Sequence, residues 1–142
     1  MRPPETGGIN LEGLAAAPNG ELIIGFRSPV PEGRALLVPL KNPREVIDGH
    51  RAKLGEPILL DLDYLGIRDL VWSGQDWFVI AGRPGGGGSE KLYRWSGGPN
   101  HPIRVEKSGF KQFNPEALAL FGSPEQPRLL VLSDDGKVSR AQ

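Results

Sequence analysis

Apolar runs alternate with turn signals along the whole chain, and the same order of elements returns. The stretch from Asn10 to Arg27, NLEGLAAAPNGELIIGFR, contains an acidic residue, a small and aliphatic run, a turn and a strongly apolar strand. The stretches from Gly66 to Arg83, GIRDLVWSGQDWFVIAGR, and from Asn114 to Asp135, NPEALALFGSPEQPRLLVLSDD, repeat this order. Self-similar units of this kind stack, because none can bury its apolar face alone.

Further apolar runs complete each unit. After the first hairpin come ALLVPL, from Ala35 to Leu40, and PILLDLD, from Pro57 to Asp63. Between them, Asn42, Pro43 and Gly49 are typical start and stop signals, so we predict a short helix near 43–48, inserted outside the repeat. The later units continue with KLYRW and PIRVEK, and with a stub, KVSRA. This pattern predicts four, four and three strands.

Units of about 40 to 50 residues with four strands each match propeller blades. We therefore predict an all-β fold that forms a single domain over residues 1–142. It is a partial β-propeller of about three four-stranded antiparallel blades, at 9–63, 66–107 and, incomplete, 113–142. Small residues in the first strands, such as Gly13 and Ala15, suit strands that converge on a propeller axis.

The number of blades is below the roughly four to eight with which propellers close. We therefore expect one of two completions. In the first, a homodimer with two-fold symmetry makes a six-bladed ring and covers its open edges. In the second, the chain is part of a longer one whose missing half completes the ring.

The composition of the chain limits the kinds of partner that we expect it to bind. The 17 basic and 17 acidic residues cancel, so we expect no nucleic-acid partner. No stretch approaches the roughly 18 apolar residues of a membrane span, and the start, MRPPETGG, has no apolar core of a signal peptide. We expect no membrane partner and, by default, a cytoplasmic location. The absence of cysteine excludes disulfides and a cysteine nucleophile.

One end of the predicted channel gathers charged residues. The two-residue turn at Asn19-Gly20 would place Glu12 opposite Arg27 across the first hairpin. Acids near the starts of the first strands are candidate calcium ligands, because calcium takes 6 to 8 oxygens: Glu12, Asp69 and Glu116. Residues at the ends of the second strands are candidate ligand-binding groups: Arg27, Arg83, Asp134 and Asp135. The alternative is that these acids form structural ion pairs, as Glu12 would with Arg27.

The aromatic residues allow two interpretations. Trp72, Trp77, Tyr93 and Trp95 could form a platform for a sugar or an aromatic ligand. Their alternating strand positions favour packing between blades. The glycine-rich run RPGGGGSEK precedes a strand and lacks the ending of a phosphate-binding loop, so it favours a flexible loop.

Several segments together resemble a known family. NLEGLAAAPNGELIIGFR, RALLVPL, GIRDL, KLYRWSG, and FNPEALAL followed by LLVLSDDG resemble the C-terminal half of a bacterial β-propeller family known as a domain of unknown function. The E-G-L-A pattern and the strand ending in S-D are more distantly similar to esterase-like phytase and calcium-dependent lactonase propellers. That similarity implies metal-binding acids at the channel mouth, at Glu12, Glu116 and, with substitution, Asp69.

These observations predict a binding module for a metal ion, with calcium as the candidate, or for a small polar ligand at one channel mouth. One alternative is a metal-dependent hydrolase of phosphate esters or lactones, in which the cation activates water or polarises the substrate. The other alternative is a structural scaffold for protein partners. No general base is identifiable from the pattern, so whether the protein is an enzyme stays open.

Overall fold

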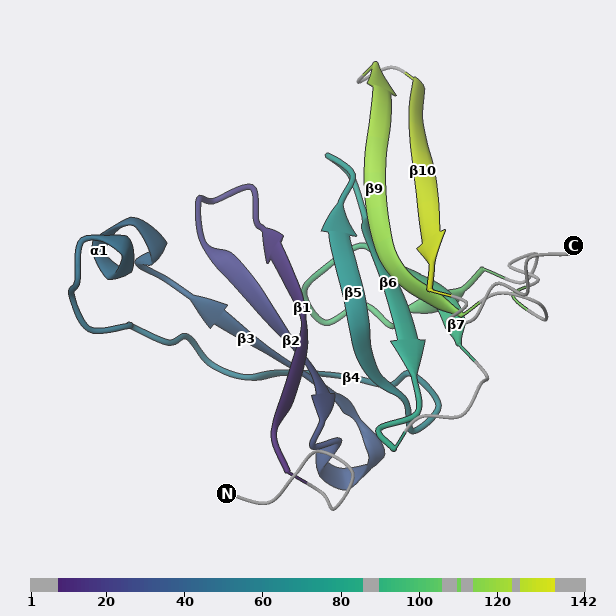
Figure 1. Cartoon of the computed structure of the whole chain (residues 1–142), viewed down its shortest axis with the longest axis horizontal. Helices are drawn as coiled ribbons and strands as arrows, with labels where there is room; N and C mark the ends of the chain where they lie inside the picture. Colours follow the sequence, from purple (N-terminus) through teal and green to yellow (C-terminus); the bar gives the residue numbers. More distant parts are fainter. Residues whose placement is uncertain (1–7, 86–89, 106–109, 111–113, 124–125, 135–142) are drawn as a thin grey trace, which may run out of the picture.

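Three antiparallel sheets make up the computed structural model, which describes residues 8–85, 90–105, 110, 114–123 and 126–134 (Figure 1). Strands are hydrogen-bonded in chain order within each sheet, and none of the sheets is closed. The first sheet contains β1 (Asn10–Ala16), β2 (Leu22–Ser28), β3 (Ala35–Leu40) and β4 (Ile58–Leu60). The second contains β5 (Gly66–Trp72), β6 (Trp77–Gly82), β7 (Lys91–Trp95) and β8 (Ile103–Arg104), and the third contains β9 (Pro115–Ser123) and β10 (Gln126–Ser133).

The prediction of an all-β fold with one short α-helix is confirmed. The helix, α1 (Pro43–Ile47), lies between β3 and β4, and a 3₁₀ turn, η2 (Pro31–Gly33), precedes β3. Asn42 is the residue before α1, but its side chain does not cap the helix: its Nδ2 donates to the backbone oxygen of Arg51 at 3.0 Å. In the described part of the chain, no helix has the length and apolar character needed to span a membrane.

Two strands are shorter than predicted. β4 ends at Leu60, before the expected end at Asp63. Asp63 and Tyr64 have φ angles of 56° and 63°, so the backbone turns there into the second sheet instead of extending the strand. β8 covers only Ile103–Arg104, and residues 106–107, predicted to continue it, lie outside the described residues, as does the predicted stub at 137–141.

The first hairpin has a different register from the one predicted. Ala16 pairs with Leu22, and the backbone N–H of Ala17 donates to the oxygen of Glu21 at 2.9 Å. The loop therefore has three residues instead of two, and it ends in Gly20, whose φ is +84°. Three-residue hairpin loops use a left-handed residue at this position, so the glycine that suggested a two-residue turn serves a longer one.

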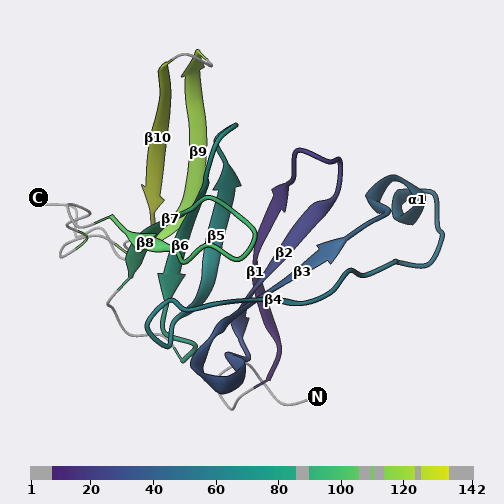
Figure 2. The ribbon, with the colours of Figure 1, turned by 180° about the vertical axis from the view of Figure 1, so that it is seen from behind.

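The three sheets stack in chain order, and their first strands are neighbours. β5 contacts β1 and β2 on one side and β9 on the other, as the views from both sides show (Figures 1 and 2). The approach is close: a Cβ added at Gly25 would lie 2.5 Å from Cγ2 of Ile67, and one added at Gly13 would lie 2.8 Å from the same atom. Glycine at these two positions lets β5 pack directly on the backbones of β1 and β2.

The main core lies between the first and second sheets. It combines Ala15, Ile23 and Leu37 of the first sheet with Ile67 and Val79 of the second. The aromatic residues close this core, as their strand positions favoured: Trp77, Tyr93 and Trp95 are buried, and the ring centroids of Trp77 and Trp95 are 6.4 Å apart. Trp72 is partly buried against the same core.

Candidate ionic site at the ends of the first strands

Each first strand contains a β-bulge near its beginning. In β1, Leu11 pairs with Phe26 and Gly13 with Gly25, so Glu12 is the extra residue between them. A bulge leaves one residue unpaired and re-aims its side chain, and this one directs Glu12 away from the regular alternation of the sheet.

The same irregularity recurs in the other two first strands. In β5, Ile67 pairs with Ala81 and Asp69 with Ile80, which leaves Arg68 as the extra residue. In β9, Pro115 pairs with Ser133 and Ala117 pairs with Leu132. Ser133 and Leu132 are consecutive, so Glu116 is the extra residue. The equivalent residues of the three units are therefore Glu12, Arg68 and Glu116.

Arg68 is the centre of a buried ionic network that joins all three sheets. Its side chain is 6% exposed. One terminal nitrogen donates to Glu90 Oε1 at 2.7 Å and to Asn114 Oδ1 at 3.0 Å, and the other donates to Glu116 Oε1 at 2.6 Å. Its Nε lies 3.7 Å from Glu12 Oε2, which is too long for a hydrogen bond. A buried guanidinium with carboxylates from three sides fixes the relative positions of the sheets at this end.

Arg27 adds a second guanidinium to the network. It donates to Glu12 Oε1 at 2.6 Å, as predicted from the hairpin, and its Nε donates to the backbone oxygen of Arg83 at 3.1 Å. The contact with Glu12 forms through the bulges: Arg27 is itself the extra residue of β2 between the partners of Asn10 and Leu11. Arg83, expected to bind ligand, is exposed and contributes a carbonyl group to this network.

Asp69 lies one residue beyond the bulge and has a different environment. Its Oδ2 accepts a hydrogen bond from the backbone N–H of Leu118 at 2.6 Å, so the carboxylate links β5 to β9. Burial raises the pKa of Asp69, while the hydrogen bonds from the backbones of Leu118 and Leu70 oppose that change. The structure therefore brings Glu12 and Glu116 to Arg68 and directs Asp69 to the backbone of the third sheet.

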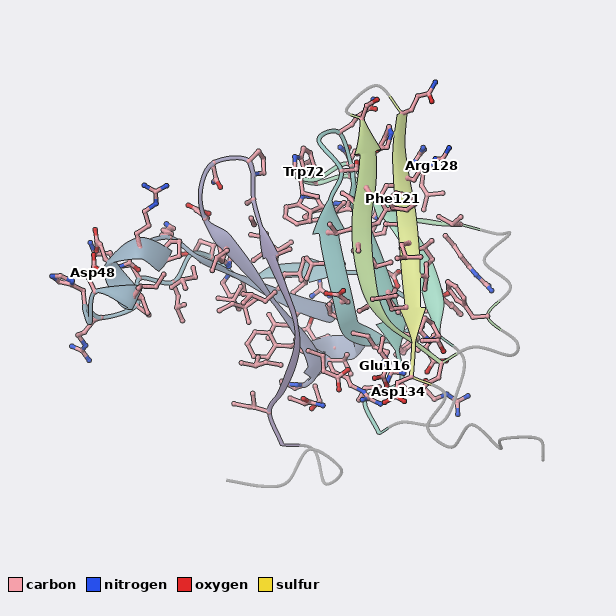
Figure 3. All side chains as sticks on the ribbon, turned by 45° about the horizontal axis from the view of Figure 1, so that its top comes forward. Asp48, Trp72, Glu116, Phe121, Arg128 and Asp134 are labelled. Carbon is pink, nitrogen blue, oxygen red and sulfur yellow. The ribbon has the colours of Figure 1, made fainter. Side chains whose placement is uncertain are left out.

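The end of β10 lies beside Glu116 (Figure 3). The backbone N–H of Asp134 donates to the oxygen of Asn114 at 3.1 Å, and Asn114 Nδ2 donates to the oxygen of Asp134 at 3.0 Å. This pairing holds Asp134 close to the network. Asp135, the other acid predicted here, lies outside the described residues.

Three members of the network were not among the predicted site residues: Arg68, Glu90 and Asn114. A signal for one of them is present in the sequence. Asn10-Leu11-Glu12 and Asn114-Pro115-Glu116 share an N-x-E pattern, and in each the asparagine Nδ2 donates to the glutamate, at 3.0 Å and 3.3 Å. Aligning Gly66-Ile67-Arg68 with this pattern, instead of matching acid to acid, identifies Arg68 as the third member.

Within the described part of the chain, the network contains three carboxylates and two guanidiniums. Its carboxylates are Glu12, Glu90 and Glu116, and its guanidiniums are Arg27 and Arg68. The described residues contain no group of three or more acidic or histidine side chains arranged to hold a metal ion. A basic group already lies between Glu12 and Glu116, so an entering cation would have to bind beside Arg68 or displace it.

A second ionic cluster lies where the turn after β4 meets β7. Asp63 Oδ2 accepts hydrogen bonds from Lys91 Nζ at 2.7 Å and from the Tyr93 hydroxyl at 2.8 Å. These bonds, that from Lys91 first, lower the pKa of Asp63, whereas burial and then the bond to Asp63 raise the pKa of Tyr93. The cluster fastens the left-handed turn that leads into β5, which is a structural role.

Fold and site together define an all-β protein of stacked antiparallel sheets, joined by a buried ionic network at the ends of their first strands. The chain belongs to the family described as "Protein of unknown function (DUF3616)", whose model matches residues 2–142. No curated protein and no solved structure gives a significant match to it. The family description agrees with the resemblance to a domain of unknown function and says nothing of blades, metal or substrate.

Proposed function

We propose that the chain is part of a β-propeller and that its sheets are successive blades. The proposal is supported by the order of strands within each sheet and by the neighbouring positions of β1, β5 and β9. It is also supported by the glycines that let these first strands approach closely. In a propeller, the first strands surround the channel, so their bulged ends lie around one mouth of it.

We further propose that this mouth binds a small ligand that carries a positive charge. The observation that carries the proposal is the convergence of Glu12, Arg68 and Glu116 from equivalent bulges. With Glu90 and Arg27 included, the described residues of the network comprise three carboxylates and two guanidiniums, which is an excess of acid over base. A cluster of charged side chains in which one sign is in excess attracts ligands of the opposite charge.

The outer acids are the groups available to a ligand. The Glu116 side chain is 41% exposed and that of Glu12 is 26% exposed, whereas Glu90 is 5% exposed and faces Arg68. Asp134, beside Glu116, is exposed as well. Carboxylate oxygens suit calcium, which makes this ion one candidate, and they suit an organic ammonium or guanidinium group equally well.

Binding has better support than turnover. A hydrolase would need a base next to the bound ligand, and among the described acids of this region burial raises the pKa of Asp69. Its carboxylate instead accepts the backbone N–H of Leu118 and ties two sheets together. We therefore propose a binding module, with calcium and small organic cations as the two ligand types to be distinguished.

Calorimetric titrations with calcium chloride and, separately, with methylguanidinium chloride test the proposal. We expect heat of binding with one probe, and its loss in Glu116→Gln and Glu12→Gln. The matched control is Glu32→Gln, which removes an equal charge from the exposed pair with Arg34. Neither heat nor a thermal shift with either probe would overturn the cation-binding proposal, and equal loss in Glu32→Gln would show that the effect is one of overall charge.

A further inference from the structure

The outward face of the first sheet is apolar. Strand alternation directs Ala15 and Ile23 into the core, and it directs their neighbours to the opposite face. There, Leu14 pairs with Ile24 and Ile24 pairs with Val38, which forms a continuous apolar row across three strands. Leu14 is 61% exposed, a large value for a leucine on a sheet with a full row of apolar neighbours.

The outward face of the third sheet is apolar as well. Leu120 and Leu129 face the second sheet, next to Phe78. The alternate residues therefore face away: Phe121, Leu130 and Leu132 are 50%, 46% and 49% exposed. Arg128 lies over the Phe121 ring, 6.0 Å from its centroid, near the far end of this face (Figure 3).

These two faces are complementary by their place in the stack. The first sheet packs on the second through the face that holds Ala15 and Ile23, and the second packs on the third through the face that holds Phe78. The outward face of the third sheet corresponds to the faces with which the first and second sheets pack on the next sheet in the chain. The outward face of the first sheet corresponds to the faces on which the preceding sheet packs. A second copy of the chain offers one face of each kind. Two copies related by a two-fold axis therefore form both junctions at once.

We propose that the outward faces of the first and third sheets are covered by a second copy of this chain, the third sheet of each copy packing on the first sheet of the other. The proposal rests on the propeller arrangement and not on the ligand. It repeats, between chains, the packing that the chain uses twice within itself. It also covers the exposed leucines on both ends, which would otherwise favour aggregation.

Sedimentation velocity over a broad range of protein concentration, without added ligand, tests the proposal. We expect a dimer that dissociates on dilution, and no higher oligomers, because the two junctions close the assembly. A monomer at all concentrations, or an open-ended series of oligomers, would overturn it. Since no ligand is present, failure here is separate from failure of cation binding.

Two surface variants determine which faces meet. Leu14→Glu and Leu130→Glu each place a charge on one exposed face, so each variant alone should be monomeric. A mixture of the two variants should form heterodimers. In a heterodimer, the unaltered third sheet of the Leu14→Glu copy packs on the unaltered first sheet of the Leu130→Glu copy. Ile47→Glu on α1, where Ile47 is 85% exposed, is the matched control and should remain dimeric. Loss of the dimer in Leu14→Glu but not in Leu130→Glu would show that like faces meet, and would also overturn the proposal.

Circular dichroism of the monomeric variants checks that they are folded. Both altered side chains are already exposed, so we expect the β-sheet spectrum and a cooperative thermal transition to persist. If either variant is unfolded, Leu14→Asn and Leu130→Asn replace it, because they disturb the faces without adding a charge. Dimerisation of both asparagine variants with unchanged affinity would count against the proposal.

Discussion

Arg68 on β5 donates to Glu116 on β9 at 2.6 Å, and each of the two residues is the unpaired residue of a bulge in the first strand of its sheet. The bulges bring side chains of two sheets to one point, where regular alternation would separate them. Glu12, the bulge residue of β1, reaches the same guanidinium. The ends of the three sheets are thus fixed by charge, while their centres are fixed by apolar packing.

Removal of the central guanidinium should destabilise the fold strongly. Arg68→Met leaves Glu12, Glu90 and Glu116 close together without their common partner, and breaking a buried pair in this way costs about 3–5 kcal/mol. Urea unfolding measures the loss. Arg68→Lys, which keeps the charge but not the planar fork of donors, should lie between wild type and Arg68→Met. A loss below about 1 kcal/mol for Arg68→Met would mean that the network contributes little.

The close approach of β5 to β2 should make Gly25 intolerant of a side chain. A methyl group there would lie 2.5 Å from Cγ2 of Ile67, and overpacking of this kind costs about 1–3 kcal/mol. Gly85→Ala, with no atom within 4 Å of the added Cβ, is the matched control. A double-mutant cycle of Gly25→Ala with Ile67→Ala should show favourable coupling, because the second change removes the clashing carbon. Additive losses would place the strain elsewhere.

Asp69 should make the fold less stable as its carboxyl ionises. Burial raises its pKa, so the folded state holds the proton more tightly than the unfolded chain. The stability that this provides is complete below the unfolded pKa and is lost as pH rises through the folded value. Asp69→Asn cannot ionise and should gain stability relative to wild type as pH rises from acid values through the range in which the carboxyl loses its proton. Chemical denaturation across this range measures the difference, and parallel pH profiles would contradict the assignment.

Tyr93 should lose its proton only at strongly alkaline pH. Burial and then the hydrogen bond to Asp63 raise the pKa of its hydroxyl. Its contribution to stability is therefore complete below about 10, the ordinary tyrosine value, and declines as pH rises further. Ultraviolet absorbance in a Tyr64→Phe background follows Tyr93 alone, since the chain has 2 tyrosines. A titration midpoint at the ordinary value would show that the bond to Asp63 is not kept in solution.

The contribution of Asp63 to stability should depend on pH in the opposite direction to that of Tyr93. Hydrogen bonds from Lys91 and Tyr93 lower its pKa, so its contribution to stability is present above the unfolded carboxyl value and is lost as pH falls through the folded one. Lys91→Met removes the first of these partners and should weaken the loss of stability in acid. Nuclear magnetic resonance titration of the Asp63 carboxyl gives the direction directly. Arg104→Met, which removes a more distant charge, should change it less.

The strands were predictable because apolar runs are bounded by glycine, proline and asparagine. β3 and β7 have the predicted bounds, and α1 lies within its predicted range. The ends of strands were less predictable: β4 stops early because Asp63 adopts a left-handed conformation, for which the sequence has no glycine to signal it. The repeat also indicated that the first strands would gather charge at one end, where Glu12 and Glu116 do meet at Arg68.

The position of Arg68 was not predictable from charge alone. Matching acid to acid pairs Asp69 with Glu12 and Glu116, one residue away from the equivalence that the bulges define. A bulge displaces side chains by one position without changing the apolar pattern on which a sequence alignment depends. The metal role of Glu12, Asp69 and Glu116 stays a prediction, and calcium titration is its test.

The order acid, base, acid along the three bulged strands has a consequence for ring closure. In each copy the first and third sheets both present an acid at this position. At both junctions of a dimer, Glu116 of one copy would therefore approach Glu12 of the other. Repulsion there opposes association in dilute buffer and fades as salt screens it. Closure of the ring by two copies would then respond to ionic strength, and the dimer should be tighter in high salt than in dilute buffer.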